Sequence, residues 1–267
     1  MFGLNNNTQY DENIRNFPSD DSYPMISILF SKNNEIEVDV LSLTVLDLIE
    51  KGQIKCEIDF DESYEVGKKL TPEDMEVMKK ITLRIANKGE LKSSESIAIN
   101  LLKSMNKNKK FNLKAMAKQT NNHSIANKFE KDFNEFITAL KNENGYDGEN
   151  YKDILQDGKL TSRGKEIKKE WKKFEEYLKS EELTEKFPPE SVLENSVQII
   201  CASCFDIEKE ALEVRENNTS LTDFIDKDGY KFLNIVFNNA LLNVTEKRKG
   251  DGIFYGINDK YTIPGGG

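Results

Sequence analysis

The sequence predicts a mainly α-helical protein with small β wings, in which tandem winged-helix-like units precede a C-terminal helical segment. Three observations predict this fold class. Apolar residues recur at helical spacing over most of the 267 residues, one short segment alternates apolar and polar residues as a half-buried strand does, and Gly and Pro residues separate these segments. A chain of this length suffices for two modest domains.

Composition and periodicity divide the chain into five regions. The first holds Asn, Asp and Ser around isolated apolar residues, and the last has too few apolar residues to fold alone. The three regions between them carry the periodic segments. We expect a flexible N-terminal arm at 1–22, a first winged-helix-like unit at 23–70, a second winged-helix-like unit at 71–180, a C-terminal helical segment at 181–249 and a Gly-rich tail at 250–267.

The first unit is expected to contain two helices and a strand. Pro24 suits the first position of a short helix that runs through Phe30. A second helix is expected from about Val38 to Lys51, because four apolar residues share one face there and Gly52 stands where a left-handed C-cap would be. Residues 54–60 then alternate apolar and polar side chains, which predicts a half-buried strand.

The second unit begins at Thr71, which is a candidate N-cap followed by Pro72 and two acidic residues. We expect helices near 74–87, 94–105, 113–119 and 124–142. A turn at Gln156-Asp157-Gly158 predicts a short hairpin between 151–155 and 159–160. Thr161 is then expected to cap a helix that carries Trp171 on its apolar stripe and ends near Ser180.

The C-terminal segment is expected to hold two long helices. Pro188-Pro189 breaks the chain before a helix that starts at Ser191 and reaches Phe205. A final helix has apolar residues in register from Leu233 to Val244.

Composition excludes several classes of protein. The sequence contains no run of about 18 apolar residues, which is the length that a transmembrane helix needs. The polar N-terminus does not resemble a secretion signal. A single histidine, His123, excludes mechanisms that need two imidazoles, and three cysteines cannot form a disulfide framework. The net charge is −8 over 1–70, +6 over 71–180 and −7 over 181–267, so a basic middle lies between acidic flanks.

The motifs that could carry chemistry have structural explanations. Cys201-Ala202-Ser203-Cys204 is expected to be the interior of an apolar helix, with redox chemistry or a zinc site completed by Cys56 and His123 as the alternatives. Residues 158–165 miss the spacing of a phosphate-binding loop, and Asp226-Lys227-Asp228-Gly229 lacks the flanking ligands of a calcium loop. We therefore expect no catalytic residues, no metal ligands and no cofactor, and predict that the protein is not an enzyme.

The basic middle favours one alternative, a nucleic-acid interface. Lysines cluster through a predicted helix-turn-helix, where a helix could enter the major groove. The candidate contacts are Lys103, Lys107, Lys109, Lys110, Lys114 and Lys118. Few arginines accompany them to bind guanine, and we expect Asp39, Asp47 and Glu50 of the first unit to face solvent and repel DNA.

The order of these pieces resembles the cytosolic region of a family of predicted prokaryotic membrane proteins of unknown function (DUF2207-like). The resemblance covers most of 23–205. It rests on residues 23–29, residues 41–54, the block 160–165 with Trp171, Phe174, Tyr177 and Leu178, the Pro188–Phe205 helix and the glycine tail. The resemblance implies winged-helix-like domains next to a membrane anchor and brings no catalytic residues.

These observations favour a non-enzymatic protein-interaction module, the intracellular part of a membrane-associated protein. The alternative is a transcription-regulator-like protein that binds nucleic acid through its basic unit. We expect a protein partner or self-association, a location in the cytoplasm or at the inner face of the cell membrane, and membrane contact only through an anchor outside this chain.

Overall fold

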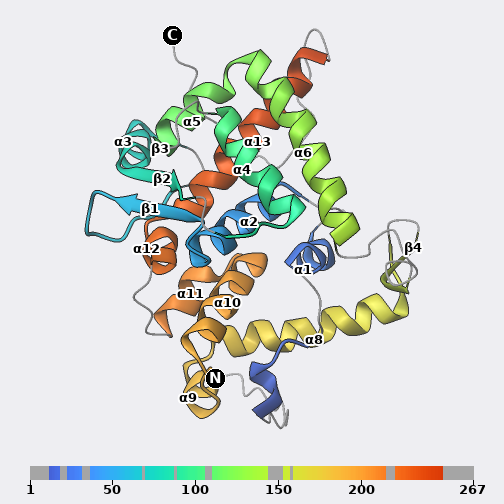
Figure 1. Ribbon diagram of the computed structural model, residues 1–267. Helices are drawn as coiled ribbons and strands as arrows, with labels where there is room; N and C mark the ends of the chain where they lie inside the picture. The colour runs from blue at the N-terminus through green and yellow to red at the C-terminus, as the bar shows by residue number, and fades with distance from the viewer. Residues whose placement is uncertain are drawn as a thin grey trace.

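The computed structural model describes residues 12–18, 23–31, 37–67, 70–86, 89–105, 110–143, 153–156, 159–214 and 220–248. It is mainly helical with a small antiparallel sheet, which confirms the predicted mainly α-helical class (Figure 1). The described elements are η1 (Glu12–Arg15), α1 (Tyr23–Phe30), α2 (Asp39–Glu50), β1 (Ile54–Ile58), α3 (Pro72–Lys80), β2 (Ile81–Ile85), α4 (Ser93–Met105), β3 (Lys110–Asn112), α5 (Leu113–Thr120), α6 (His123–Glu143), β4 (Leu155–Gln156), β5 (Lys159–Leu160), α8 (Ser162–Lys179), α9 (Glu181–Lys186), α10 (Val192–Ala202), η2 (Ser203–Phe205), α11 (Glu208–Glu213), α12 (Ser220–Asp226) and α13 (Gly229–Arg248).

The expected helix ends are confirmed where a capping residue marks them. Thr71 and Asp74 form a reciprocal capping box at the start of α3, and the Thr161 hydroxyl accepts a hydrogen bond from the Gly164 amide at the start of α8. Gly52 follows α2 with φ of +67°, the left-handed conformation expected of it.

The helix predicted over 74–87 is wrong in its second half. The helix ends at Lys80, and residues 81–85 form β2 at the centre of a three-stranded antiparallel sheet of order β1-β2-β3. Ile81, Leu83 and Ile85 are buried while Arg84 between them is exposed, so this short segment has the period of a strand. In the register of the sheet Leu83 pairs with Cys56 on one side and with Phe111 on the other.

The sheet joins the two units expected from the sequence. β1 belongs to the expected first unit, whereas its described partner β2 belongs to the second. The hairpin expected near 151–160 is present, with Leu155 opposite Leu160, and it lies at one end of α8 (Figure 1).

Two apolar clusters form the interior of the described chain. The larger takes side chains from α2, the sheet, α4, α5, α6, α12 and α13, and the Phe129 and Phe237 rings stack in it at 5.7 Å. The smaller takes side chains from α1, the hairpin, α8, α10 and α11, with Trp171 and Phe174 packed edge to face at 5.5 Å. Cys204 contacts both clusters. The C-terminal helix α13 therefore completes a core that begins with α2.

Part of the predicted N-terminal arm is described. Residues 12–18 of the predicted arm are packed on the protein, since Gln198 donates a hydrogen bond to the Arg15 carbonyl at 2.9 Å and Ile14 contacts the smaller cluster. The short helices α9, α11 and α12 lie in the expected helical segment but were not predicted one by one. The predicted Gly-rich tail at 250–267 lies outside the described residues. Within the described ranges, no helix is both long enough and apolar enough to traverse a bilayer.

Candidate functional site

A cavity of about 540 Å³ lies where the two apolar clusters meet. Its walls come from α1, the start of α2, α8, η2 and α13. These elements are far apart in the sequence, and the packing of α13 across α2 brings them together (Figure 1). A concave site with several polar groups is the usual form of a ligand site, so this cavity is the candidate functional site.

Asp39, in the first turn of α2, supplies a carboxylate to the cavity. Its Oδ2 accepts a hydrogen bond from the Ser27 hydroxyl of α1 at 3.1 Å, its Oδ1 is buried without a close partner, and the backbone amides of Asp39 and Val40 lie near enough to the carboxylate to lower its pKa. Burial raises the pKa of Asp39 to about 6, against the lowering effect of the Ser27 hydrogen bond. Asp39 is half-buried, so the expectation that it faces solvent is only partly met. The carboxylate is turned into the protein, where it titrates near neutral pH.

The opposite wall carries Tyr230 and Asn234 on α13 and Ser203 on η2. The Tyr230 hydroxyl donates to the Ser203 carbonyl at 3.4 Å and is hydrogen-bonded to Asn234. Burial, followed by the charge of Asp39, raises the pKa of Tyr230 well above its usual value, which keeps the phenol protonated. Asn234 Oδ1 and Ser203 Oγ are buried without a hydrogen-bond partner. These two oxygens therefore lie just behind the cavity surface.

The CxxC motif ends at this cavity. Cys201 is buried at the end of α10 and Cys204 lies in η2 against the cavity, and both are free thiols. Burial raises the pKa of each thiol, so both hold their protons at neutral pH. Among the described residues, no group of three His, Cys, Asp or Glu side chains is placed to hold a metal ion. Cys56 lies on β1 and His123 at the start of α6, away from the cavity lining.

An aromatic pair forms the apolar part of the wall. The rings of Phe30 and Phe205 pack edge to face with centroids 4.7 Å apart. Lys168 of α8 places its Nζ 5.0 Å from the Phe30 centroid and donates to the Leu29 carbonyl at 2.5 Å. The cavity therefore combines an apolar side with a polar one.

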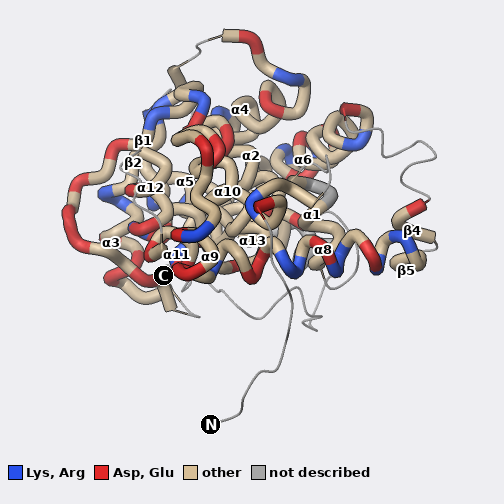
Figure 2. The backbone as a smooth tube through the Cα atoms, turned by 90° about the horizontal axis from the view of Figure 1, so that it is seen from below, with Lys and Arg blue, Asp and Glu red and all other residues tan. Residues whose placement is uncertain are grey.

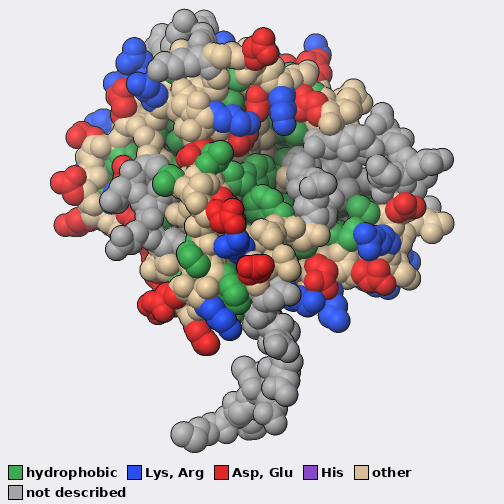
Figure 3. All heavy atoms as spheres, turned by 60° about the horizontal axis from the view of Figure 1, so that its bottom comes forward, with side chains coloured by type: hydrophobic (Ala, Val, Ile, Leu, Met, Phe, Trp, Pro, Cys, Tyr) green, Lys and Arg blue, Asp and Glu red, His purple; other side chains and the backbone are tan. Residues whose placement is uncertain are grey.

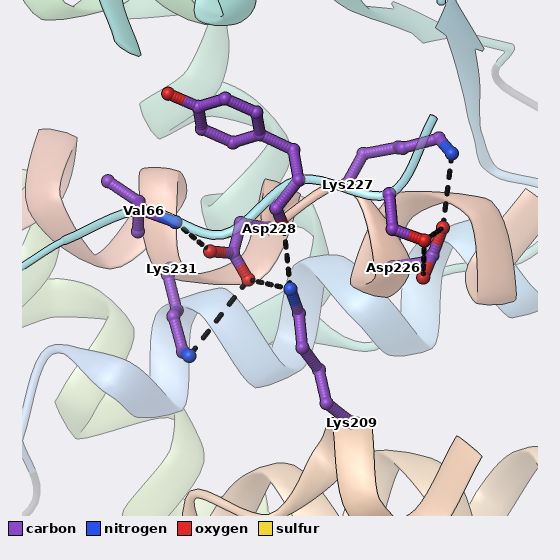
Figure 4. Close-up of polar contacts among 8 residues, drawn as sticks. Val66, Lys209, Asp226, Lys227, Asp228 and Lys231 are labelled. Carbon is purple, nitrogen blue, oxygen red and sulfur yellow. Dashed lines mark hydrogen bonds and ion pairs between the residues drawn. The ribbon is translucent and has the colours of Figure 1, made fainter. Parts of the chain in front are cut away.

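A buried polar network adjoins the cavity at the turn between α12 and α13 (Figure 4). Asp228, with φ of +55° and almost no exposure, lies 2.9 Å from Lys209 Nζ and 3.9 Å from Lys231 Nζ, and it accepts a hydrogen bond from the Val66 amide. Lys209 also donates to the Tyr64 carbonyl at 2.5 Å. The segment that resembles a calcium loop is thus a turn, as expected, and it also fixes the loop after β1.

The candidate nucleic-acid lysines do not form one free surface. Lys110 pairs with Glu57 at 2.5 Å and Lys114 pairs with Glu76, whereas Lys103 and Lys118 are exposed on α4 and α5. Lys107 and Lys109 lie outside the described residues. Basic and acidic residues also alternate along the chain in Figure 2, α8 included. The basic middle predicted from net charge is therefore interspersed with carboxylates.

The sequence did not point to the cavity. Ser27, Ser203, Tyr230 and Asn234 are ordinary helix residues when taken singly, and Asp39 at a helix start is favourable without any function.

The family comparison covers the N-terminal part of this arrangement. A family model described as the C-terminal domain of a predicted membrane protein (DUF2207) matches residues 10–157. A search of curated proteins and a search of solved structures found no match. The matched segment contributes α1 and α2 to the cavity, whereas α8, η2 and α13 lie beyond it.

Proposed function

Because the chain belongs to the DUF2207 family of predicted membrane proteins, we propose that it is the intracellular, non-enzymatic protein-interaction module of a membrane-associated protein. The observation that supports this proposal most directly is an exposed apolar corner, defined by Phe17, Val192 and Leu193. These are the large hydrophobic side chains that stand exposed in the described chain, at 41%, 69% and 64%. The Arg15–Glu190 ion pair joins the segment that carries Phe17 to the one that leads into Val192 and Leu193, and contiguous exposed apolar patches are typical of interaction surfaces.

The apolar corner is held in place by local contacts. Phe17 packs its ring on Trp171 and Phe174 of α8 at 5.9 and 5.4 Å. Val192 and Leu193 form the first turn of α10 and follow the loop that Arg15 binds through Glu190. Figure 3, in which the bottom of Figure 1 comes forward, shows hydrophobic side chains between charged ones on that face.

Acidic residues precede the first turn of α10 in the chain and suggest the partner's chemistry. Glu181, Glu182, Glu185 and Glu190 are exposed on α9 and on the loop before α10. An apolar corner with acidic residues nearby in the chain fits a protein surface that presents apolar side chains flanked by Lys or Arg. Burial of the exposed side-chain area of Val192 and Leu193 against a partner would contribute about 2 to 4 kcal/mol to the binding free energy. This corresponds to a Kd lower by about thirtyfold or more.

The chemistry of the cavity supports a binding role over catalysis. The Cys204 thiol and the Tyr230 hydroxyl both have raised pKa values and stay protonated, so neither is an activated nucleophile.

The paired lysines Lys110 and Lys114 give nucleic-acid binding less support than protein binding.

The proposal is tested with the double variant Val192→Ser/Leu193→Ser. Captured proteins are compared by quantitative mass spectrometry between wild type and variants in extracts of cells that express the full chain, and light scattering measures self-association. We expect the wild type to bind a partner or to dimerise, and we expect the double variant to do so with a Kd about thirtyfold higher. The control Lys118→Ser/Gln119→Ser changes two adjacent exposed residues on α5 and should retain the wild-type binding. If wild type binds nothing, or binds equally when the corner is changed, the proposal is wrong.

A further inference from the structure

Buried oxygen atoms without hydrogen-bond partners gather at the cavity. They are Asp39 Oδ1, Ser203 Oγ and Asn234 Oδ1, and each belongs to a residue that lines it. A buried polar atom left without a partner costs about 1 to 3 kcal/mol. The three oxygens lie just behind the cavity surface, where small side-chain rotations would let them accept hydrogen bonds from a ligand.

A ligand at these oxygens must donate hydrogen bonds. A carboxylate oxygen and an amide oxygen can only accept, and a hydroxyl can do either. Water could satisfy the hydrogen bonds but would leave the Asp39 charge without a counter-ion in a buried site. A donor that is also positively charged satisfies both needs.

The charges around the cavity also favour a cation. Four carboxylates line it, from Glu37, Asp39, Glu175 and Asp206, against the two lysines Lys172 and Lys231. Glu175 is paired with Lys179 at 2.8 Å, and Lys231 is directed to Asp228 at 3.9 Å. Four carboxylates against two lysines make the lining acidic by formal charge, and Lys168 beside Phe30 is a further cation near its edge.

The apolar side of the cavity indicates an organic cation. Phe30 and Phe205 supply apolar surface that can contact a hydrocarbon chain, and the ammonium group of Lys168 already lies over the Phe30 ring. A metal ion would need more ligands than the single buried carboxylate Asp39 with an amide and a hydroxyl. A volume of about 540 Å³ is ample for an alkylamine or for one long side chain.

We propose that this cavity binds a primary ammonium or guanidinium group, with Asp39 as its counter-ion, Asn234 and Ser203 as hydrogen-bond acceptors, and Phe30 and Phe205 against its hydrocarbon part. Small rotations of the Asp39 and Asn234 side chains bring the three oxygens to the ligand. The group can belong to a free amine or to a Lys or Arg side chain of a protein. The proposal does not depend on the apolar corner, which lies on other residues.

The test measures binding of four matched probes to the full chain by isothermal titration calorimetry. The probes are n-pentylammonium, n-butylguanidinium, n-pentanol and pentanoate. We expect the two cations to bind and the neutral and anionic isosteres not to bind. Binding of pentanoate would reveal an anion site at Lys172, equal binding of pentanol would reveal a merely apolar cavity, and absence of cation binding would leave only ordered water. Each of these three results overturns the proposal.

Variants identify the counter-ion. Asp39→Asn should raise the Kd of both cations about tenfold to a hundredfold, which is the range for the loss of a hydrogen bond to a charged group. Asp47→Asn, on the same helix but outside the cavity lining, should leave the Kd unchanged. If Asp39→Asn fails to fold, Asn234→Ser removes a second acceptor and should also weaken binding. Unchanged affinity in a folded variant of either residue contradicts the proposal.

The pH dependence gives an independent readout. Affinity of the wild type should rise from about pH 5 to about pH 7 as Asp39 ionises, and Asp39→Asn should lose this rise. The other charged or titratable groups that line the cavity are Glu37, Lys172, Glu175, Cys204, Asp206, Tyr230 and Lys231. Tighter binding of a Lys-containing peptide, acetyl-Gly-Lys-Gly-amide, than of n-pentylammonium assigns the site to a protein side chain, and the reverse order assigns it to a free amine.

Discussion

Glu208, the first residue of α11, should make the protein less stable as the pH rises. Its side chain is almost fully buried, at 2% exposure, and Oε2 has no hydrogen-bond partner. Burial, together with the charges of Asp206 and Asp228, raises the pKa of Glu208 from 4.5 to about 7, and the charge of Lys231 opposes this shift. The folded chain therefore keeps this proton at pH values where the unfolded chain has lost it.

The sign and size of the effect follow from linkage. Because the folded state binds more protons, the free energy of unfolding falls as pH rises from about 4.5 and levels off above about pH 7. A pKa difference of about 2.5 corresponds to about 3 kcal/mol. Glu208→Gln removes the charge with little change of shape. The variant should match the wild type near pH 4.5 and exceed its stability by up to about 3 kcal/mol at pH 8.

Urea denaturation from about pH 5 to about pH 8 measures this difference. Glu210→Gln is the matched control, since Glu210 is exposed on the same helix and should leave the pH profile as it is. Asp39 titrates in an overlapping range, so part of the slope should remain in Glu208→Gln. The reasoning is refuted if Glu208→Gln lowers stability at pH 8 or keeps the full slope of the wild type.

Three further predictions concern packing, the ion pair and nucleic acid. Gly164→Ala should cost about 1 to 3 kcal/mol in urea denaturation, because a Cβ there would lie 2.3 Å from the Ile154 carbonyl oxygen. Lys209→Met should cost about 3 kcal/mol by leaving the buried Asp228 with a weakened ion pair, whereas Lys131→Met at an exposed pair should change stability by less than about 0.5 kcal/mol. Duplex DNA should keep its gel mobility in low salt, and a salt-sensitive shift would favour the nucleic-acid alternative.

Helix positions were predictable because local signals specify them. Thr161 caps α8 and Gly52 ends α2 through interactions with their immediate neighbours. The strand at 81–85 was not predicted because it follows α3 with no Gly or Pro between them, and Ile81 alone makes the change to extended backbone. Its strand state depends on pairing with residues 54–58 and 110–112, which is information that the segment itself does not contain.

The cavity was not predictable for a related reason. Asp39 becomes a half-buried acid only when α1 and α13 cover the start of α2, and Asn234 lies nearly two hundred residues away along the chain. Sequence patterns alone predict that a carboxylate at a helix start lies in solvent, where it interacts favourably with the helix dipole. Tertiary packing overrides that rule here and raises the pKa of Asp39 to about 6.

The packing also sets the extent of the folding unit. The family match ends at residue 157, yet Phe237 of α13 stacks on Phe129 and Asp228 holds the Val66 amide. Helices beyond the matched segment therefore supply part of its core. Because the cavity walls come from both sides of residue 157, a ligand in the cavity would contact both parts and stabilise their association by its own binding free energy.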